Sequence, residues 1–140
     1  SARHDHFRHL RRDGDTPLHR PALVIHDAGI HDNTSPISVG TIPWEQGLGF
    51  YPTTFQTMGA KNDLVGVIWA DEQQVWQRMS PGVRRLNRAN IGFNVPPGAI
   101  SADMLRPTGV ELATLLLAQR RARRPDLPEA PGMPPTPPVN

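Results

Sequence analysis

Residues 64–69 read Leu-Val-Gly-Val-Ile-Trp and form the most strand-like stretch of this 140-residue chain. Three of the six are β-branched, and such residues fit the pleated, half-buried surface of a sheet. Gly66 allows another backbone to approach closely at this point. We therefore expect a β-strand here, around which the remaining elements are arranged.

Two shorter runs before it also predict strands. Residues 22–25 are apolar and precede a turn-like Asp-Ala-Gly sequence, and residues 37–42 alternate between two prolines. Residues 43–62 instead combine aromatic side chains with glycines and prolines. We expect a long loop over 43–62, of the kind that is usually functional or interfacial in a small domain.

The strongest helical pattern covers residues 108–124. Thr108 and Glu111 have the spacing of a capping box, in which each side chain binds a free backbone N–H at the start of the helix. Apolar residues then recur at helical spacing, and Pro125 ends the pattern. This stretch predicts a helix that packs one face on the core.

Two shorter helices are expected before it, over residues 71–79 and 81–89. The first begins at an aspartate, and the second follows Ser80-Pro81, a capping residue with proline at the first helical position. Ser101 is interpreted as the cap of a further single turn.

The pattern as a whole predicts a small mixed α+β domain with few short strands, three to four helices and extended N- and C-terminal arms. We expect a polar His/Arg-rich arm over 1–20, one α+β domain over 21–124 and an extended tail over 125–140. The tail holds seven of the 16 prolines and no aromatic residue, so it has little surface to bury.

Composition excludes several classes of protein. The chain has no cysteine, which removes disulfide scaffolds, thiolate metal sites and cysteine nucleophiles. No apolar run approaches the length of a membrane span, and residues 1–15 are too charged for a signal peptide. We therefore expect no membrane partner and a location inside a cell or in a virion.

Charge is unevenly distributed along the chain, although the net charge is only +2. Residues 21–79 carry two basic and six acidic side chains, whereas residues 80–124 carry eight arginines and two acidic side chains. Two groups of these arginines fall on single helical faces. They are the candidate nucleic-acid-binding residues Arg84, Arg85, Arg88, Arg120, Arg121 and Arg124. Arginine also stabilises helix C-termini and is common in protein interfaces, which is the alternative interpretation.

All six histidines lie within the first 31 residues, and several adjoin an aspartate. Imidazole and carboxylate groups together suit zinc, manganese or iron. The candidate metal ligands are His4, His6, His26 and His31. Their spacing matches no standard metalloenzyme motif, and we prefer the interpretation that a polar arm hydrogen-bonds to a partner.

No other motif indicates catalysis. No serine lies in a nucleophile elbow, and Gly47-Leu48-Gly49 is followed by proline where a dinucleotide-binding loop needs its third glycine. We expect no cofactor and no enzymatic activity.

The expected function is therefore structural. Five of the eight aromatic residues lie between positions 44 and 69, which indicates a dense core or interface there. The candidate interface residues are Trp44, Phe50, Tyr51 and Phe55. We expect a non-enzymatic assembly subunit of a large complex, a homo- or hetero-oligomer such as a phage-like virion, whose arms hold neighbouring subunits. A nucleic-acid-binding accessory protein is the alternative, and a His/Asp metal-dependent enzyme is the third hypothesis.

Overall fold

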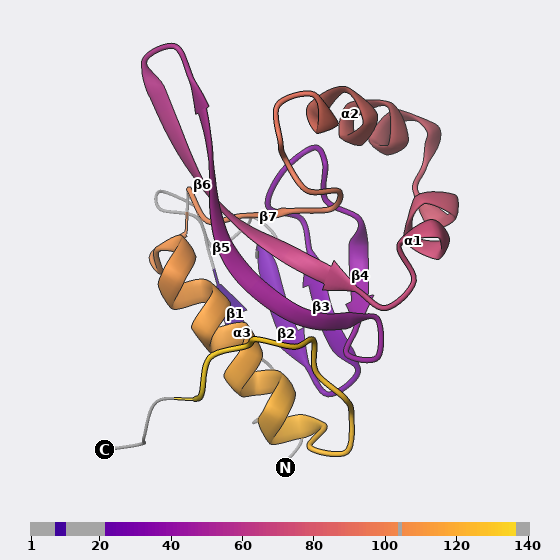
Figure 1. Cartoon of the computed structure of the whole chain (residues 1–140), viewed down its shortest axis with the longest axis vertical. Coiled ribbons are helices and arrows are strands. Elements are labelled where there is room, and N and C mark those ends of the chain that lie inside the picture. The colour runs from indigo at the N-terminus through magenta and orange to yellow at the C-terminus, as the bar shows by residue number, and fades with distance from the viewer. Residues whose placement is uncertain (1–7, 11–21, 104, 137–140) are drawn as a thin grey trace.

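The computed structural model describes residues 8–10, 22–103 and 105–136 (Figure 1). The elements, in chain order, are β1 (Arg8–Leu10), β2 (Leu23–His26), β3 (Gly29–Asp32), β4 (Gly40–Pro43), β5 (Gly47–Thr57), β6 (Ala60–Trp69), α1 (Glu72–Arg78), α2 (Pro81–Ile91), β7 (Ile100–Ser101) and α3 (Gly109–Arg123). The strands form two antiparallel sheets, with strand orders β1-β2-β3-β4 and β5-β6-β7. The expected α+β class is confirmed, with three helices in the described residues.

One hydrophobic core joins both sheets to α3. Leu23 and Ile25 of β2 alternate with less buried neighbours, as expected for a strand with one face on the core. Val65 and Val67 of β6 enter the same cluster, and α3 lies across β5 and β6 (Figure 1). The apolar stripe expected over residues 108–124 therefore packs on the second sheet.

The long loop expected over residues 43–62 is wrong. Most of this segment belongs to β5 and β6, which pair from Gly47 opposite Trp69 to Thr57 opposite Ala60. Pro52 is tolerated because β5 is an edge strand of its sheet, where the missing N–H is least costly. The outer half of the hairpin stands well beyond the rest of the molecule (Figure 1).

Tyr51 and Gly66 face one another across this hairpin. A Cβ added to Gly66 would lie 2.2 Å from the Cζ of Tyr51, so the ring occupies the space that any other residue would fill. Burial raises the pKa of the Tyr51 hydroxyl, with a smaller contribution from the nearby Glu72 charge. The glycine expected to allow close backbone approach therefore admits an aromatic ring instead.

The three helices expected from capping patterns are confirmed. Asp71 caps α1, Ser80 caps α2 ahead of a proline, and Thr108 and Glu111 form the reciprocal capping box of α3. These signals are local, so they do not depend on distant residues. Ser101, in contrast, caps no helix; it lies in β7, where its N–H donates to the Thr34 hydroxyl.

Two further strands have bounds different from those expected. The strand expected over 22–25 is β2, one residue further along, but that expected over 37–42 begins only at Gly40. The preceding Ile37 is buried in a second, smaller apolar cluster, so its side chain has the pattern of a strand without the backbone pairing. Within the predicted polar arm, residues 8–10 form β1 and pair with β2.

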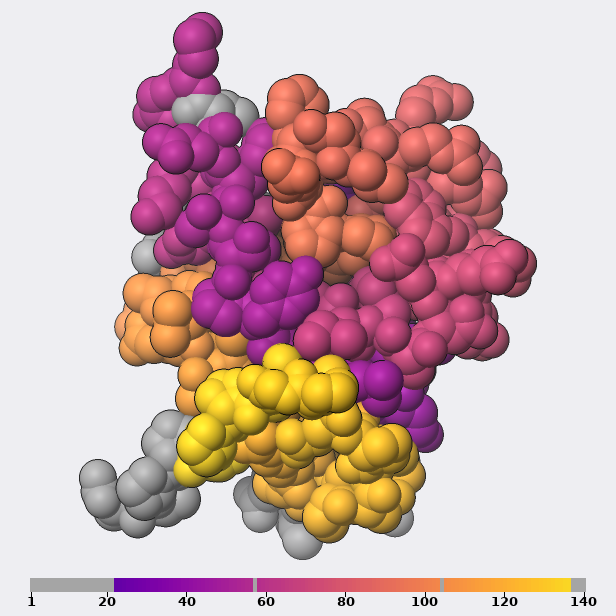
Figure 2. Space-filling model, viewed as in Figure 1, coloured from indigo at the N-terminus to yellow at the C-terminus, as the bar shows by residue number. Residues whose placement is uncertain are grey.

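The described part of the proline-rich tail, residues 125–136, does not extend freely. It lies against the body of the molecule below β5, where it is yellow in Figure 2. Ala130 is buried and donates its N–H to the carbonyl of Leu48, and Leu127 and Met133 pack against the core. Three spaced apolar residues therefore dock the described part of the tail on the chain's own core.

Arg120 holds this tail from inside the molecule. Its side chain is 1% exposed, and it donates from Nε to the Trp44 carbonyl at 3.0 Å and from Nη2 to the Pro128 carbonyl at 2.7 Å. Buried charge is stable only when hydrogen-bonded, and these two carbonyls serve that purpose. Burial lowers the pKa of Arg120, but an arginine remains protonated.

Replacing Arg120 and its neighbour should therefore have unequal effects. We expect Arg120→Met to lower the free energy of unfolding by about 2–3 kcal/mol, because it leaves two inward-facing carbonyls without donors. Arg121→Met removes a partly exposed pair with Glu129 and a hydrogen bond to the Thr136 hydroxyl, both at the surface, and should cost only about 1 kcal/mol. Urea denaturation of both variants measures the difference, and equal losses would contradict the role given to Arg120.

A double-mutant cycle tests the packing of Tyr51 on Gly66. Gly66→Ala should destabilise the wild-type chain by about 1–3 kcal/mol, because the ring must move. In a Tyr51→Ala background the same change should be neutral or slightly stabilising, since alanine suits a strand better than glycine. Additive effects in urea denaturation would show that the ring does not depend on the glycine.

Candidate interaction surface

The aromatic residues proposed for an interface divide into two groups. Trp44 is fully buried, with its Nε1 donating to the His26 carbonyl at 3.1 Å, and Phe50 is 2% exposed. Of the two alternatives that the sequence left open, core or interface, these two side chains lie in the chain's own core. Tyr51 and Phe55 are half-buried, and the Phe55 ring contacts Phe93 edge-on at 5.7 Å between centroids. Of the four aromatic candidates, only Phe55 contacts an exposed apolar side chain, that of Phe93.

The candidate metal ligands are brought together only in part. His4 and His6 lie outside the described residues. His26 and His31 lie on neighbouring strands, and His31 aligns with Val24, two residues from His26 on the same face. His31 Nδ1 lies 3.2 Å from the Thr41 hydroxyl. Burial chiefly lowers the pKa of His26, with a further contribution from the charge of His31. Across residues 22–103 and 105–136, no three histidine or acidic side chains are grouped to hold a metal.

Asp32 is the buried acid that the sequence did not single out. It is fully buried, and its Oδ1 accepts hydrogen bonds from the Thr34 N–H at 2.9 Å and the Thr34 hydroxyl at 2.6 Å. The same hydroxyl accepts the N–H of Ser101, so this group joins the first sheet to β7 of the second. Burial raises the pKa of Asp32 to about 6, although hydrogen bonds from Thr34 and Ser38 oppose the shift. Its place is structural.

The two arginine clusters, alike in sequence, have different surroundings. On α3, Arg121 makes a two-pronged contact with Glu129, Arg123 pairs with Asp27, and Arg124 pairs with Asp126 and Glu45. Hydrogen bonding to Arg121 holds the pKa of Glu129 below its usual range. With Arg120 buried, the α3 cluster is largely neutralised by the chain itself.

The α2 arginines have no such acidic partners. Arg84 donates to the carbonyls of Trp76, Gln77 and Met79, at the C-terminal end of α1. Arg85 and Arg88 form no ion pair or hydrogen bond with any residue that the structure describes. No acidic residue occurs between Gln73 and Ala102. Of the six candidate arginines, only the three on α2 leave their charge uncompensated.

Asn87 fixes the orientation of α2 and was missed in the sequence. It is 1% exposed; its Nδ2 donates to the carbonyls of Ile37 and Val83, and its Oδ1 accepts the N–H of Gly98. A polar residue in a helix rich in arginine gives no local sign of burial. With Asn87 facing inward, the two flanks of α2 face hollows on either side.

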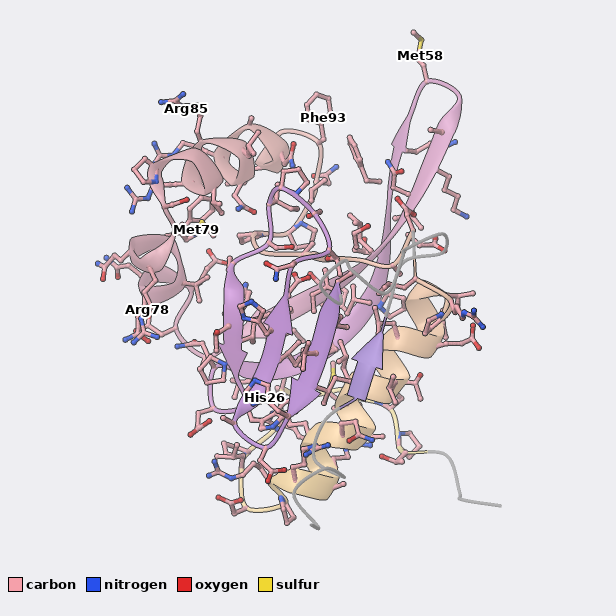
Figure 3. The ribbon with its side chains drawn as sticks, turned by 180° about the vertical axis from the view of Figure 1, so that it is seen from behind. His26, Met58, Arg78, Met79, Arg85 and Phe93 are labelled. Atoms are coloured by element: carbon pink, nitrogen blue, oxygen red, sulfur yellow. The ribbon has the colours of Figure 1, made fainter. Side chains whose placement is uncertain are left out.

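The first hollow lies between α2 and the β5–β6 hairpin and has a volume of about 290 Å³. Its apolar lining includes Ile37, Phe55, Leu64, Leu86 and Val95. Large apolar side chains are exposed beside it: Phe93 is 64% exposed and Leu86 44% exposed. Met58, at the tip of the hairpin, is fully exposed, and Figure 3 shows it pointing away from the molecule.

The second hollow, of about 550 Å³, lies between α1 and α2. Its lining consists of Gln73, Trp76, Gln77, Arg84, Arg88 and Ile91. A third, of about 300 Å³, lies between α1 and the ends of β4 and β6, where Val75 and Met79 of α1 contribute to its wall. The three hollows surround the α1–α2 region, which is therefore the candidate interaction surface.

Comparisons with known proteins give no match: no family model, no curated protein and no solved structure is significantly similar to this chain. Among the described residues, none of the helices is both long enough and apolar enough to cross a membrane.

The buried carboxyl gives a test of the core between the sheets. Because the pKa of Asp32 is higher in the folded chain, its contribution to stability is greatest at low pH and is lost as the pH rises through about 6. In the Asp32→Asn variant, the side chain at this position no longer titrates. The free energy of unfolding of this variant, relative to wild type, should rise by about 2.4 kcal/mol between about pH 4 and about pH 7.5. Urea denaturation across this range measures it, and a constant difference would contradict an elevated pKa.

Proposed function

We propose that this chain is a non-enzymatic structural or assembly subunit that associates with a second copy of itself through the β5–β6 hairpin. The observation that carries the proposal is the fully exposed Met58 at the tip of a hairpin projecting beside an apolar hollow. Exposed apolar side chains gathered at one place are typical of protein–protein contacts.

Met58 and the hollow have complementary properties. Methionine is flexible and apolar, and it fills irregular apolar spaces well. The hollow is lined by apolar side chains from β6, α2 and the loop after α2. Phe93 lies at the same end of the molecule as this hollow (Figure 3). Because the tip and the hollow lie on one end of the same chain, a two-fold pair can place each tip in the other copy's hollow.

The sequence predicted that terminal arms hold the neighbouring subunits. We propose instead that the β5–β6 hairpin makes this contact. The described tail residues dock on the chain's own core, whereas the outer half of the hairpin projects away from it (Figures 1 and 2). The projecting arm is therefore internal to the chain rather than terminal. Its two strands hold each other in register, so it does not need a partner in order to form.

Native mass measured across a concentration series tests the proposal. We expect wild-type protein to form a dimer or larger assembly, and Met58→Asp and Phe93→Asp each to raise the dissociation constant at least tenfold. Burying one such side chain is worth about 1.5–3 kcal/mol, which corresponds to that factor. Analytical ultracentrifugation gives the constants.

The matched control is Val110→Asp. Val110 is 62% exposed on α3, outside the hairpin and the hollow, so the same change of chemistry there should leave association unchanged. Wild-type protein that remains a monomer at every concentration would refute self-association. Equal weakening by the Met58 and Val110 variants would show that the hairpin is not the contact.

A further inference from the structure

The hollow between α1 and α2 combines positive charge with one aromatic surface. Arg84 and Arg88 line it from α2, and Trp76 and two glutamine amides line it from α1. Arg85 follows Arg84 on α2 but is not part of this lining, and Figure 3 shows it on the side of α2 that faces away from α1. We call the lining residues the α1–α2 groove: Gln73, Trp76, Gln77, Arg84, Arg88 and Ile91, with Arg85 as a further positive charge at its edge.

The charge of the groove has no internal counterpart. Arg85 and Arg88 make no ion pair within the described residues, and no acid occurs in sequence from Gln73 to Ala102. The arginines of α3 show that this chain elsewhere supplies carboxylates where arginines gather. Three positive charges left together on one short helix therefore favour an anionic ligand from outside.

The groove is also held in a fixed shape. Arg84 joins α2 to α1 through three backbone carbonyls, and Asn87 joins α2 to the segments at Ile37 and Gly98. Capping by Asp71 and Ser80 fixes both helix starts. The charged side chains thus extend from a rigid support, so little backbone order has to be gained on binding.

We propose that the α1–α2 groove binds single-stranded nucleic acid without sequence preference. Arginine suits contacts to phosphate oxygens, and the exposed part of Trp76 offers a flat surface on which an unpaired base can stack. The glutamines add hydrogen-bonding groups for the backbone.

An acidic protein segment would satisfy the same arginines, and it is the competing partner. The single-stranded ligand is favoured because the groove itself is mostly polar and aromatic, with Ile91 its one aliphatic residue. The large apolar anchors that a protein partner needs lie on the other flank of α2, at Leu86 and Phe93. The inference uses residues different from those of the proposed self-association, so either can fail alone.

The test is fluorescence anisotropy with a labelled single-stranded oligothymidine of about 12 nucleotides, within the usual site size of such proteins. With three arginines on phosphates, the logarithm of the binding constant should fall with the logarithm of salt concentration with a slope of about −2. Arg85→Ala with Arg88→Ala should weaken binding at least tenfold at low salt and reduce the slope to about −0.7. Both side chains are exposed and unpaired, so the variant should fold.

The charge-matched control is Lys61→Ala with Arg106→Ala, which removes two exposed charges outside the groove and should leave the slope unchanged. Trp76→Leu should weaken binding about tenfold at constant slope, because stacking is lost while the charges remain. Circular dichroism establishes that this variant is folded.

Three outcomes would overturn the inference. The first is salt-insensitive or absent binding by the wild-type chain. The second is equal weakening by the groove variant and its control. The third is tighter binding to poly-glutamate or to duplex DNA than to the oligothymidine, which would assign the groove to an acidic protein or to a double helix. Since Met58→Asp should leave oligothymidine binding intact, loss of self-association and loss of this site are distinguishable.

Discussion

The arrangement of the whole molecule depends on the burial of β6 from both sides. Val65 and Val67 enter the main core with the first sheet and α3, while Leu64 enters the smaller cluster with Ile37 and Val95. Gly66 accepts the ring of Tyr51. A strand fixed on both faces can extend outward as a stable hairpin and can also carry the connection to α1 at its other end. The two regions that we assign to binding thus start from the same strand.

The arginine clusters show how far tertiary context decides the meaning of charge. Arg84, Arg85 and Arg88 have the same spacing as Arg120, Arg121 and Arg124, so the sequence alone does not distinguish the two clusters. Folding brings the acidic residues of the tail and of the turn after β4 to α3, but brings none to α2. The proline-rich tail thus has a second effect besides covering the core, since it neutralises one of two basic surfaces.

The features that could be predicted from the sequence are those that depend on interactions between residues close together in the chain. The capped helix starts at Asp71, Ser80 and Thr108 depend on residues within one turn, and all three were predicted. The strand β5 depends on pairing with β6, and its glycines and proline hide that pairing from a local pattern. Asn87 and Arg120 are buried because segments far along the chain supply their partners, which no spacing rule reveals.

The same limit applies to the candidate site. The α2 arginines were identified as possible anion ligands, but their selection over the α3 arginines required knowing where the carboxylates lie. The exposed apolar residues Met58, Leu86 and Phe93 gave no signal at all, because apolar residues in a sequence are expected to be buried. The exposure of these three side chains becomes informative only once the structure shows which apolar residues form the core.

The geometry of α2 lets the two proposed surfaces operate together. Residues four apart share a helical face, so Leu86 and Asn90 meet the hollow beside the hairpin while Arg84 and Arg88 meet the groove beside α1. Asn87 lies between these flanks and faces the interior, which keeps the helix from turning toward either ligand. Occupying one side of α2 therefore does not require the other side to move.

In a two-fold pair each subunit would retain its own basic groove. Two grooves on one assembly would bind a single strand more tightly than one groove alone, since the second contact becomes intramolecular.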